Sequence, residues 1–268
     1  MFQPPFFAGI DVGSSFTKVV LLNKEKQICG QDVRYSGTDL MAAAEQGLQA
    51  ALPTTSHISD IKRIVSTGYG RENVQITDIP ILKITEISCS TKGAHFLYPN
   101  RDLTIVDIGG QDTKIIKTRN GKRTSFKMNR KCAAGTGSFL EELALKLRIE
   151  LSNLDKLANR SESPTQISSY CTVFAATEIL SRIRQGERLE DMIRGAFHSI
   201  VKRVLEIDVL ENEIILTGGV IAHNPTIADI FKEELGRPVS VAPSPQMIVA
   251  LGAALYALEK EINVWGHV

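Results

Sequence analysis

The sequence of 268 residues predicts an α/β protein made of two similar lobes. Two similar eight-residue segments, Asp11–Lys18 and Asp107–Lys114, align without gaps. In both copies, two short apolar runs flank a glycine-containing tip, and a third strand-like run and then helical stretches follow. A duplicated unit of this kind predicts two related lobes with a cleft between the two tips.

In the first copy, two apolar runs meet at Gly13-Ser14-Ser15, which predicts a β-hairpin. Asp39 can cap a helix, and Pro53 follows the end of that helix. The elements expected in this half are strands at Phe6–Asp11, Thr17–Leu22, Gln27–Tyr35 and Arg63–Thr67, and helices at Leu40–Leu52 and Glu86–Leu97.

In the second copy, an apolar strand ends at Gly109-Gly110, and the turn Asn120-Gly121 predicts a further hairpin. The strands expected here are Leu103–Ile108, Thr113–Lys117, Lys122–Met128, Glu213–Leu216 and Pro238–Ala242. The helices expected are Gly137–Leu147, Ser152–Ala158, Thr172–Arg184, Glu190–Leu205, Thr226–Leu235 and Gln246–Glu259. We therefore place one lobe at residues 1–88 with 250–268, and the other at residues 89–249.

The composition is that of an ordinary water-soluble protein. Lys plus Arg is 31 and Asp plus Glu is 30, so the net charge of +1 gives no reason to expect nucleic acid or an anionic membrane as a partner. No apolar run approaches the roughly 18–20 residues that span a bilayer, and the segment Met1–Phe7 does not resemble a signal peptide. We expect a cytoplasmic protein, in which four cysteines are more typically thiols or metal ligands than disulfides.

The two tips predict phosphate-binding loops, because a tight glycine turn brings backbone N–H groups against phosphate oxygens. The hydroxyl groups of the first tip add donors, and its lysine adds a positive charge. The nucleotide contacts expected from this tip are Gly13, Ser14, Ser15, Phe16, Thr17 and Lys18. Asp11 and Asp107 end their strands as acceptors suited to holding Mg²⁺ through its waters.

The second tip adds Gly109, Gly110 and Asp112 as nucleotide contacts, and Gln111 as a side chain that can orient an attacking water. A single tip of this type is more often a plain hairpin turn, but two matched tips are much stronger evidence.

An apolar strand that ends at Gly218-Gly219 would let a flat adenine or ribose approach the backbone, although an ordinary strand-to-helix turn is the alternative. For Gln246 we hold a nucleotide contact and a simple helix start about equal.

Cys132 and Cys171 each precede an amphipathic helical stretch. They lie 39 positions apart, too far for a CxxC clip, and one chain offers too few thiolates for a four-cysteine site. A two-fold dimer would supply the four cysteines that a [4Fe–4S] cluster requires. Helix N-termini favour an anionic cluster, and Arg130 and Lys131 act in the same direction. The alternative, a buried structural thiol, is the reading we favour for Cys29 and Cys89.

These segments resemble the two phosphate motifs and the adenosine motif of the superfamily of actin, sugar kinases and heat-shock chaperone ATPases, which has a ribonuclease H-like fold. With the cysteines added, about residues 8–258 resemble the ATP-dependent activators of 2-hydroxyacyl-CoA dehydratases, with benzoyl-CoA reductase ATPase subunits and the reductases of double-cubane cluster proteins as relatives. The quoted motifs match that family except at Ala176-Thr177-Glu178, where the family commonly has Glu-Ser-Glu.

The resemblance implies a duplicated actin-like fold with an inter-lobe nucleotide cleft, and an ATPase coupled to one-electron transfer. It further implies a homodimer with one [4Fe–4S] cluster, held by Cys132 and Cys171 of both chains, and one ATP or ADP site with Mg²⁺ per subunit. Asp11, Asp107 and Gln111 become the catalytic candidates. An iron–sulfur dehydratase or reductase would accept the electron, and ferredoxin or flavodoxin would donate it. A small-molecule kinase or an actin-like filament former of the same fold remains an alternative.

Overall fold

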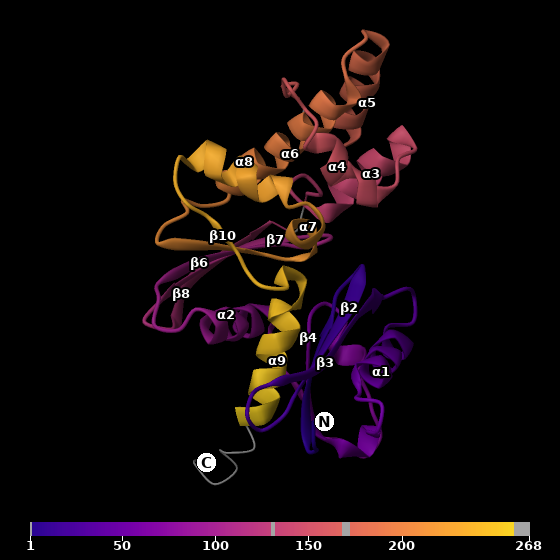
Figure 1. Ribbon diagram of the computed structural model, residues 1–268, viewed down its shortest axis with the longest axis vertical. Helices are drawn as coiled ribbons and strands as arrows, with labels where there is room; N and C mark the ends of the chain where they lie inside the picture. Colours follow the sequence, from indigo (N-terminus) through magenta and orange to yellow (C-terminus); the bar gives the residue numbers. More distant parts are fainter. Residues whose placement is uncertain (1, 130–131, 168–171, 260–268) are drawn as a thin grey trace. The chain divides into compact units, whose positions relative to one another are not determined.

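The computed structural model describes residues 2–129, 132–167 and 172–259 (Figure 1). The chain divides into two compact units: unit 1 is Met1–Asn100 with Gln246–Val268, and unit 2 is Arg101–Pro245. From the sequence we placed these boundaries at residues 88 and 249. In the structure, helix α2 (Glu86–Leu97) packs against helix α9 (Ile248–Glu259) and belongs to unit 1.

Unit 1 contains a five-stranded mixed sheet in the order β3-β2-β1-β4-β5. Strand β1 pairs antiparallel with β2 and parallel with β4, so the hairpin and the crossover strand flank one central strand. The strands are β1 (Phe6–Val12), β2 (Phe16–Leu22), β3 (Ile28–Tyr35), β4 (Ile61–Thr67) and β5 (Ile81–Lys83).

Helices cover both faces of this sheet. Alternate residues of β1 point to opposite faces, and so Phe6 and Ile10 pack on one side with α1 (Leu40–Ala51), whereas Phe7 packs on the other side with α9. Figure 1 shows α1 and α9 on opposite sides of the strands. Because both faces are covered, all seven residues of β1 are buried, including Asp11 at its end.

Glycines let α9 approach its neighbours at backbone distance. A Cβ placed on Gly9 of β1 would lie 2.0 Å from the carbonyl oxygen of Ala250, and one on Gly252 would lie 1.8 Å from that of Cys89. Real Cβ atoms do not approach backbone oxygens so closely, and these positions therefore require glycine.

We expect Gly252→Ala to destabilise unit 1 by roughly 3 kcal/mol, the upper end of typical overpacking costs, because the backbones of α2 and α9 must separate. The melting temperature, measured by circular dichroism, should fall by about 6–12 °C. Gly47→Ala in α1 is the control, because the atoms nearest its added Cβ are side-chain ends at 3.0 Å and beyond. Equal melting temperatures for both variants would contradict the tight α2–α9 contact.

Unit 2 repeats the architecture of unit 1. Its sheet has the order β10-β9-β6-β7-β8, with β6 antiparallel to β7 and parallel to β9. The strands are β6 (Leu103–Ile108), β7 (Thr113–Arg119), β8 (Lys122–Asn129), β9 (Glu213–Thr217) and β10 (Ser240–Val241). Asp11 pairs with Lys18 in unit 1 and Asp107 pairs with Lys114 in unit 2. The two copies inferred from the sequence therefore also have the same strand register.

Helices α3, α6 and α8 pack on one face of the second sheet and form its largest apolar core. The helices of unit 2 are α3 (Gly137–Leu147), α4 (Leu154–Ala158), α5 (Thr172–Arg184), α6 (Leu189–Leu205), α7 (Gly219–His223) and α8 (Thr226–Leu235). Short 3₁₀ turns occur at Ile58–Asp60, Arg71–Asn73, Leu151–Asn153 and Pro245–Met247.

The predicted α/β class and its duplicated form are confirmed. Strand β5 and helix α7 were not expected from the sequence, because β5 has only three residues and α7 begins at a glycine, a poor helix former. The strand expected at Pro238–Ala242 is shorter in the structure. Across residues 2–129, 132–167 and 172–259, no helix is both long enough and apolar enough to span a bilayer.

Candidate functional site

Both predicted phosphate loops are closed by the same backbone hydrogen bond. In unit 1 the N–H of Gly13 donates to the carbonyl of Phe16 at 3.1 Å, and in unit 2 the N–H of Gly109 donates to the carbonyl of Asp112 at 2.9 Å. A Cβ on Gly13 would lie 2.7 Å from the carbonyl oxygen of Phe16. The tightness of the first loop therefore depends on glycine, as the sequence pattern indicated.

Asp11 is almost completely buried at the base of the first loop. Lys18 donates to Oδ2 of Asp11 at 3.0 Å, whereas Oδ1 is buried with no hydrogen-bond partner in the described part of the chain. Gly68, with a φ of +86°, lies against Oδ1, because a Cβ there would approach that oxygen to 2.5 Å. A buried carboxylate oxygen without a donor is costly, and a bound cation or its water would satisfy it.

The remaining residues of the first loop differ in exposure. Ser14, Ser15 and Phe16 are half-buried at the tip. Thr17 is fully buried, and its hydroxyl lies 2.9 Å from the hydroxyl of Ser36. The Ser36 hydroxyl also lies 2.8 Å from the carbonyl oxygen of Gly13. The hydroxyl of Thr17, which we expected to face a phosphate, is thus engaged inside the hairpin.

In the second loop, the buried Lys114 pairs with Asp112 at 2.5 Å, and Gln111 is exposed at the tip. Asp107, at the end of β6, is also buried. The parallel strand β9 ends beside it, and a Cβ on Gly218 would lie 2.6 Å from Oδ1 of Asp107. The structure therefore brings the second phosphate loop and the Gly218-Gly219 turn together within unit 2.

Gly218 has a φ of +98°, a conformation that favours glycine, and it caps helix α7. Its N–H donates to the carbonyl of Pro245 at 2.9 Å. Pro245, the residue just before Gln246, thus lies beside the Gly218-Gly219 turn. Gln246 itself is half-buried in a 3₁₀ turn.

The start of helix α3 is hydrogen-bonded to the second phosphate loop. The N–H of Gly137 donates to the carbonyl of Gly109 at 2.9 Å, and the N–H and hydroxyl of Ser138 both donate to the carbonyl of Gly110, at 2.7 and 2.8 Å. These donors belong to the first turn of α3, whose N–H groups have no partner within the helix. Displacing either loop glycine would therefore move α3.

The loop before α3 contains Cys132, and it is fixed from two sides. The hydroxyl of the buried Thr113 donates to the carbonyl of Gly135 at 2.6 Å. Asn129, at the end of β8, donates from its amide to the carbonyls of Cys132 and Ala134, at 3.1 and 3.0 Å. The backbone around Cys132 is thus bonded both to the phosphate-loop strand β7 and to β8.

Arg203 of α6 lies against this loop. A Cβ on Gly135 would lie 3.1 Å from Cγ of Arg203. The pKa of the Arg203 guanidinium is raised, chiefly by its hydrogen bond to Glu206 at 2.6 Å and also by an interaction with the Cys132 thiol. Arg203 therefore presents positive charge to Cys132, which is half-buried and not in a disulfide.

The chemistry of the described residues suits the nucleotide, the divalent cation and the cluster that we expect to bind here. The buried, unpartnered oxygen of Asp11 and the glycine turns fit a nucleotide with a divalent cation. A free, half-buried thiol beside an arginine fits an anionic cluster. Cys171, the second predicted ligand, lies outside the described residues.

The other two cysteines are packed differently. Cys89 in α2 is fully buried, and desolvation raises the pKa of its thiol to about 12. Cys29 in β3 is partly exposed, and its thiol pKa is also raised, mainly by desolvation. High pKa values disfavour the thiolate form that binds metals. Both residues are therefore poor ligand candidates.

Sequence reasoning missed several residues that shape the site, notably Ser36, Gly68, Thr113 and Ser138. The motif Gly68-Tyr69-Gly70 directly after β4 was a visible signal, since glycines that follow a strand often mark a close backbone approach. Ser36 and Ser138 carry no comparable signal, because their partners lie 23 and 28 positions away.

Comparison with known proteins agrees with this geometry. Residues 8–257 match the model of the BadF/BadG/BcrA/BcrD ATPase family. The chain is 40% identical over 260 residues to the activator of lactoyl-CoA dehydratase from Anaerotignum propionicum, covering 94% of this chain and 96% of that protein.

Two solved structures are similar to this one, each with a TM-score of 0.86. Component A of the Acidaminococcus fermentans (R)-2-hydroxyglutaryl-CoA dehydratase is 36% identical, with 96% of this chain and 99% of that chain covered. The activator of the 2-hydroxyisocaproyl-CoA dehydratase from Clostridium difficile, with bound ADPNP, is 35% identical, with 98% and 99% covered.

The fold extends to a glucokinase of the ROK family from Streptomyces griseus, with a TM-score of 0.59 at 12% identity, which shows a shared fold alone. The resemblance inferred from the two phosphate motifs, the adenosine motif and the cysteines is thereby confirmed. By the extent of the match and by its fold, the chain belongs to the BadF/BadG/BcrA/BcrD ATPase family.

Proposed function

We propose that this protein is an ATP-hydrolysing activator of an iron–sulfur enzyme of the 2-hydroxyacyl-CoA dehydratase type, and that two identical subunits share one [4Fe–4S] cluster. The names of its relatives, which are 36–40% identical, support this class of partner. Ferredoxin or flavodoxin is the electron donor that we propose. The protein would act in the cytoplasm, where such carriers occur.

The observation that carries the proposal is the hydrogen-bonded link between the second phosphate loop and the Cys132 loop. Gly137 and Ser138 donate three hydrogen bonds, two from N–H groups and one from a hydroxyl, to the carbonyls of Gly109 and Gly110. The hydroxyl of Thr113 donates to the carbonyl of Gly135. A nucleotide that binds the loop 109–112 would therefore bias the position of the loop 132–136, because packed elements shift between discrete arrangements. A plain ATPase or kinase would not require this link to a cysteine loop.

Each part of the site has a proposed role. The N–H groups of Gly13 and Gly109 close the two tips, and the other backbone N–H groups of the tips bind phosphate oxygens together with Ser14, Ser15 and Lys18. Asp11 and Asp107 hold Mg²⁺ through its waters. The exposed Gln111 orients the attacking water. Gly218, Gly219 and Gln246 contact the adenosine.

Cys132 and Cys171 of both subunits would hold the cluster, which supplies one-electron transfer when bound. Arg203 places a guanidinium beside Cys132, where the proposed anionic cluster would bind. Glu206 binds the same guanidinium at 2.6 Å and keeps it in place.

Anaerobically purified and reconstituted protein tests the proposal directly. We expect ATP hydrolysis, an iron–sulfur absorption band and about four iron atoms per dimer. The reduced protein should support turnover of a 2-hydroxyacyl-CoA dehydratase only when ATP is present. A protein that hydrolyses ATP but binds no iron after reconstitution would contradict the proposal and leave a bare ATPase.

A further inference from the structure

The β7–β8 hairpin and the residues after it carry an unbalanced positive charge. In the whole chain the charges nearly cancel, with 31 basic and 30 acidic residues. The 19 residues from 113 to 131 contain eight basic and no acidic residues. The basic residues are Lys114, Lys117, Arg119, Lys122, Arg123, Lys127, Arg130 and Lys131.

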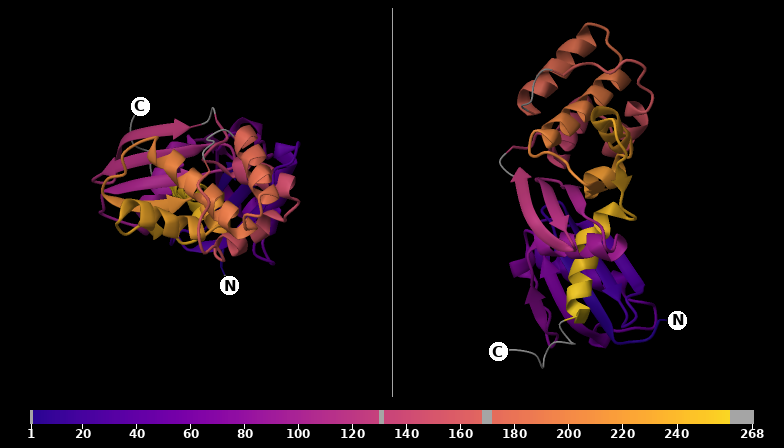
Figure 2. Two further views of the ribbon diagram at one scale, coloured as in Figure 1. Left: turned by 90° about the horizontal axis from the view of Figure 1, so that it is seen from above. Right: turned by 90° about the vertical axis from the view of Figure 1, so that its left-hand side faces the viewer.

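Strand β8 presents part of this charge at the edge of the second sheet. It is the last strand in the sheet order, and Figure 2 shows it at the margin of the sheet. All residues from Lys122 to Lys127 are exposed, so the strand is uncovered on both faces. Phe126 is 47% exposed, and the guanidinium of Arg123 lies 5.4 Å from its ring centroid. The edge therefore combines free backbone groups, positive charge and an aromatic surface.

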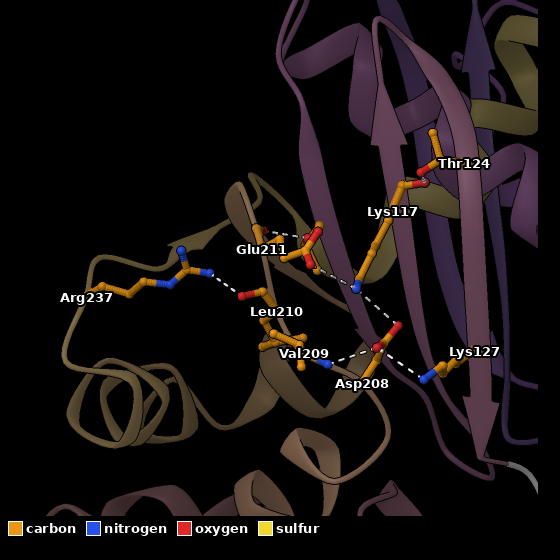
Figure 3. A network of polar contacts seen from close by, with 9 residues as sticks. Lys117, Thr124, Lys127, Asp208, Val209, Leu210, Glu211 and Arg237 are labelled. Carbon is orange, nitrogen blue, oxygen red and sulfur yellow. Dashed lines mark hydrogen bonds and ion pairs between the residues drawn. The ribbon is translucent and has the colours of Figure 1, made fainter.

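The carboxylate of Asp208, in the loop before β9, binds two lysines of the β7–β8 hairpin (Figure 3). Asp208 pairs with Lys117 at 3.3 Å and with Lys127 at 3.1 Å. Although desolvation acts to raise it, hydrogen bonds from Lys127 and Lys117 lower the pKa of Asp208, so it stays charged at neutral pH. Arg237 fixes the same loop through the carbonyl of Leu210 at 2.6 Å.

Lys122 and Arg123 are the basic side chains that remain available on the strand itself. Within the described ranges, no carboxylate forms an ion pair with either of them. The exposed edge thus keeps net positive charge after Asp208 is counted.

The edge is also hydrogen-bonded to the proposed cluster loop. Asn129, the last residue of β8, donates to the carbonyl of Cys132 at 3.1 Å, and only three positions separate the two residues. Three extended residues span at most about 11 Å. A protein bound along β8 would therefore lie close to Cys132.

Lysines on an edge strand can also serve to prevent strand pairing between copies. That role would explain Lys122 and Arg123, but it does not account for the exposed ring of Phe126 beside Arg123. A second copy of this chain is a poor occupant, because two such strands would place like charges opposite one another. Charge complementarity instead selects a partner with an acidic surface.

We propose that the exposed β8 edge, with Lys122, Arg123 and Phe126 at its centre, is the docking surface for an acidic electron-carrier protein. The inference rests on the proposed function, because a carrier bound at this edge would lie next to Cys132, the proposed cluster ligand. Complementary charge steers the encounter and raises its rate at low salt.

The test is fluorescence anisotropy, with labelled ferredoxin or flavodoxin titrated by the reconstituted full-length protein at low and at high salt. We expect Lys122→Glu with Arg123→Glu to weaken binding at low salt by about tenfold to a hundredfold. Lys24→Glu with Lys156→Glu changes the net charge equally at two other exposed positions and should bind like the wild type. ATP hydrolysis should be unchanged in both variants.

Equal binding by both double variants, or binding that ignores salt, would overturn the docking inference while the cluster and ATPase measurements still stand. The same holds if the wild type binds neither carrier. Tighter binding of a DNA duplex than of either carrier, lost in Lys122→Glu with Arg123→Glu, would show a nucleic-acid surface and also overturn it. Carrier binding through this edge by a protein that cannot hold iron would uphold the docking surface and refute the proposed function.

Discussion

Cys132→Ser is expected to reduce the iron content of the reconstituted protein at least tenfold and to remove the iron–sulfur absorption band. One substitution removes two of the four proposed thiolates, because each subunit of a dimer carries it, and a serine hydroxyl is a poor replacement for a thiolate. The structure supports the choice of this cysteine, since Cys132 is a free, half-buried thiol beside Arg203. The measurements are iron and sulfide content and the visible spectrum under anaerobic conditions.

Cys29→Ser is the matched control for this prediction. Cys29 is also a partly exposed free thiol, but it lies in β3 of unit 1 and its pKa is raised, so it should not contribute to the cluster. ATP hydrolysis should persist in both variants, because neither changes a phosphate loop. Retention of a full cluster by Cys132→Ser would refute the ligand assignment.

The parts of the fold that could be predicted from the sequence are those fixed by local patterns. Two segments that align without gaps, Asp11–Lys18 and Asp107–Lys114, form hairpins with the same strand register, because the turn of a hairpin sets its register. Both glycine tips formed the expected tight loops for the same reason. Helices with clear periodicity, such as α2 and α3, have the predicted bounds.

The parts that escaped prediction depend on contacts between distant residues. Thr113 and Gly135 are 22 positions apart, and no local pattern indicates that a hydroxyl of β7 holds the cysteine loop. Gly68 was missed because its need for glycine comes from Asp11, on the neighbouring strand. The link between phosphate loop and cysteine loop, which carries the functional proposal, was therefore invisible in the sequence even though both motifs were recognised.

Thr17 is the opposite case, because the sequence indicated a contact that its buried side chain does not offer. Its hydroxyl looked like a phosphate donor, because it follows Ser14 and Ser15 in a glycine-containing tip. The hairpin register instead buries Thr17, whereas its neighbours Phe16 and Lys18 stay partly exposed, and its hydroxyl bonds to Ser36. Residue type identified the loop, and strand alternation decided which of its side chains remain available.

Asp11→Asn is expected to slow ATP hydrolysis by roughly a hundredfold or more, within the range found when one electrostatic stabiliser is removed from an active site. Asp11 is buried, and its Oδ1 has no hydrogen-bond partner among the described residues, an arrangement that is unfavourable unless it serves a ligand. Asparagine keeps the shape of the side chain but removes the negative charge that we propose holds Mg²⁺ through its waters.

Folding should be much less affected than hydrolysis. A neutral amide is easier to bury than a carboxylate, and Lys18, which loses the ion pair at 3.0 Å, is partly exposed and can be hydrated. We therefore expect a change in unfolding free energy within about 1 kcal/mol. Asp229→Asn is the control, because Asp229 is an exposed carboxylate of α8 that pairs with Lys232, and this variant should hydrolyse ATP like the wild type. If Asp11→Asn also retains full Mg²⁺-dependent hydrolysis, Asp11 is not part of the catalytic site, and its buried charge must have another cause.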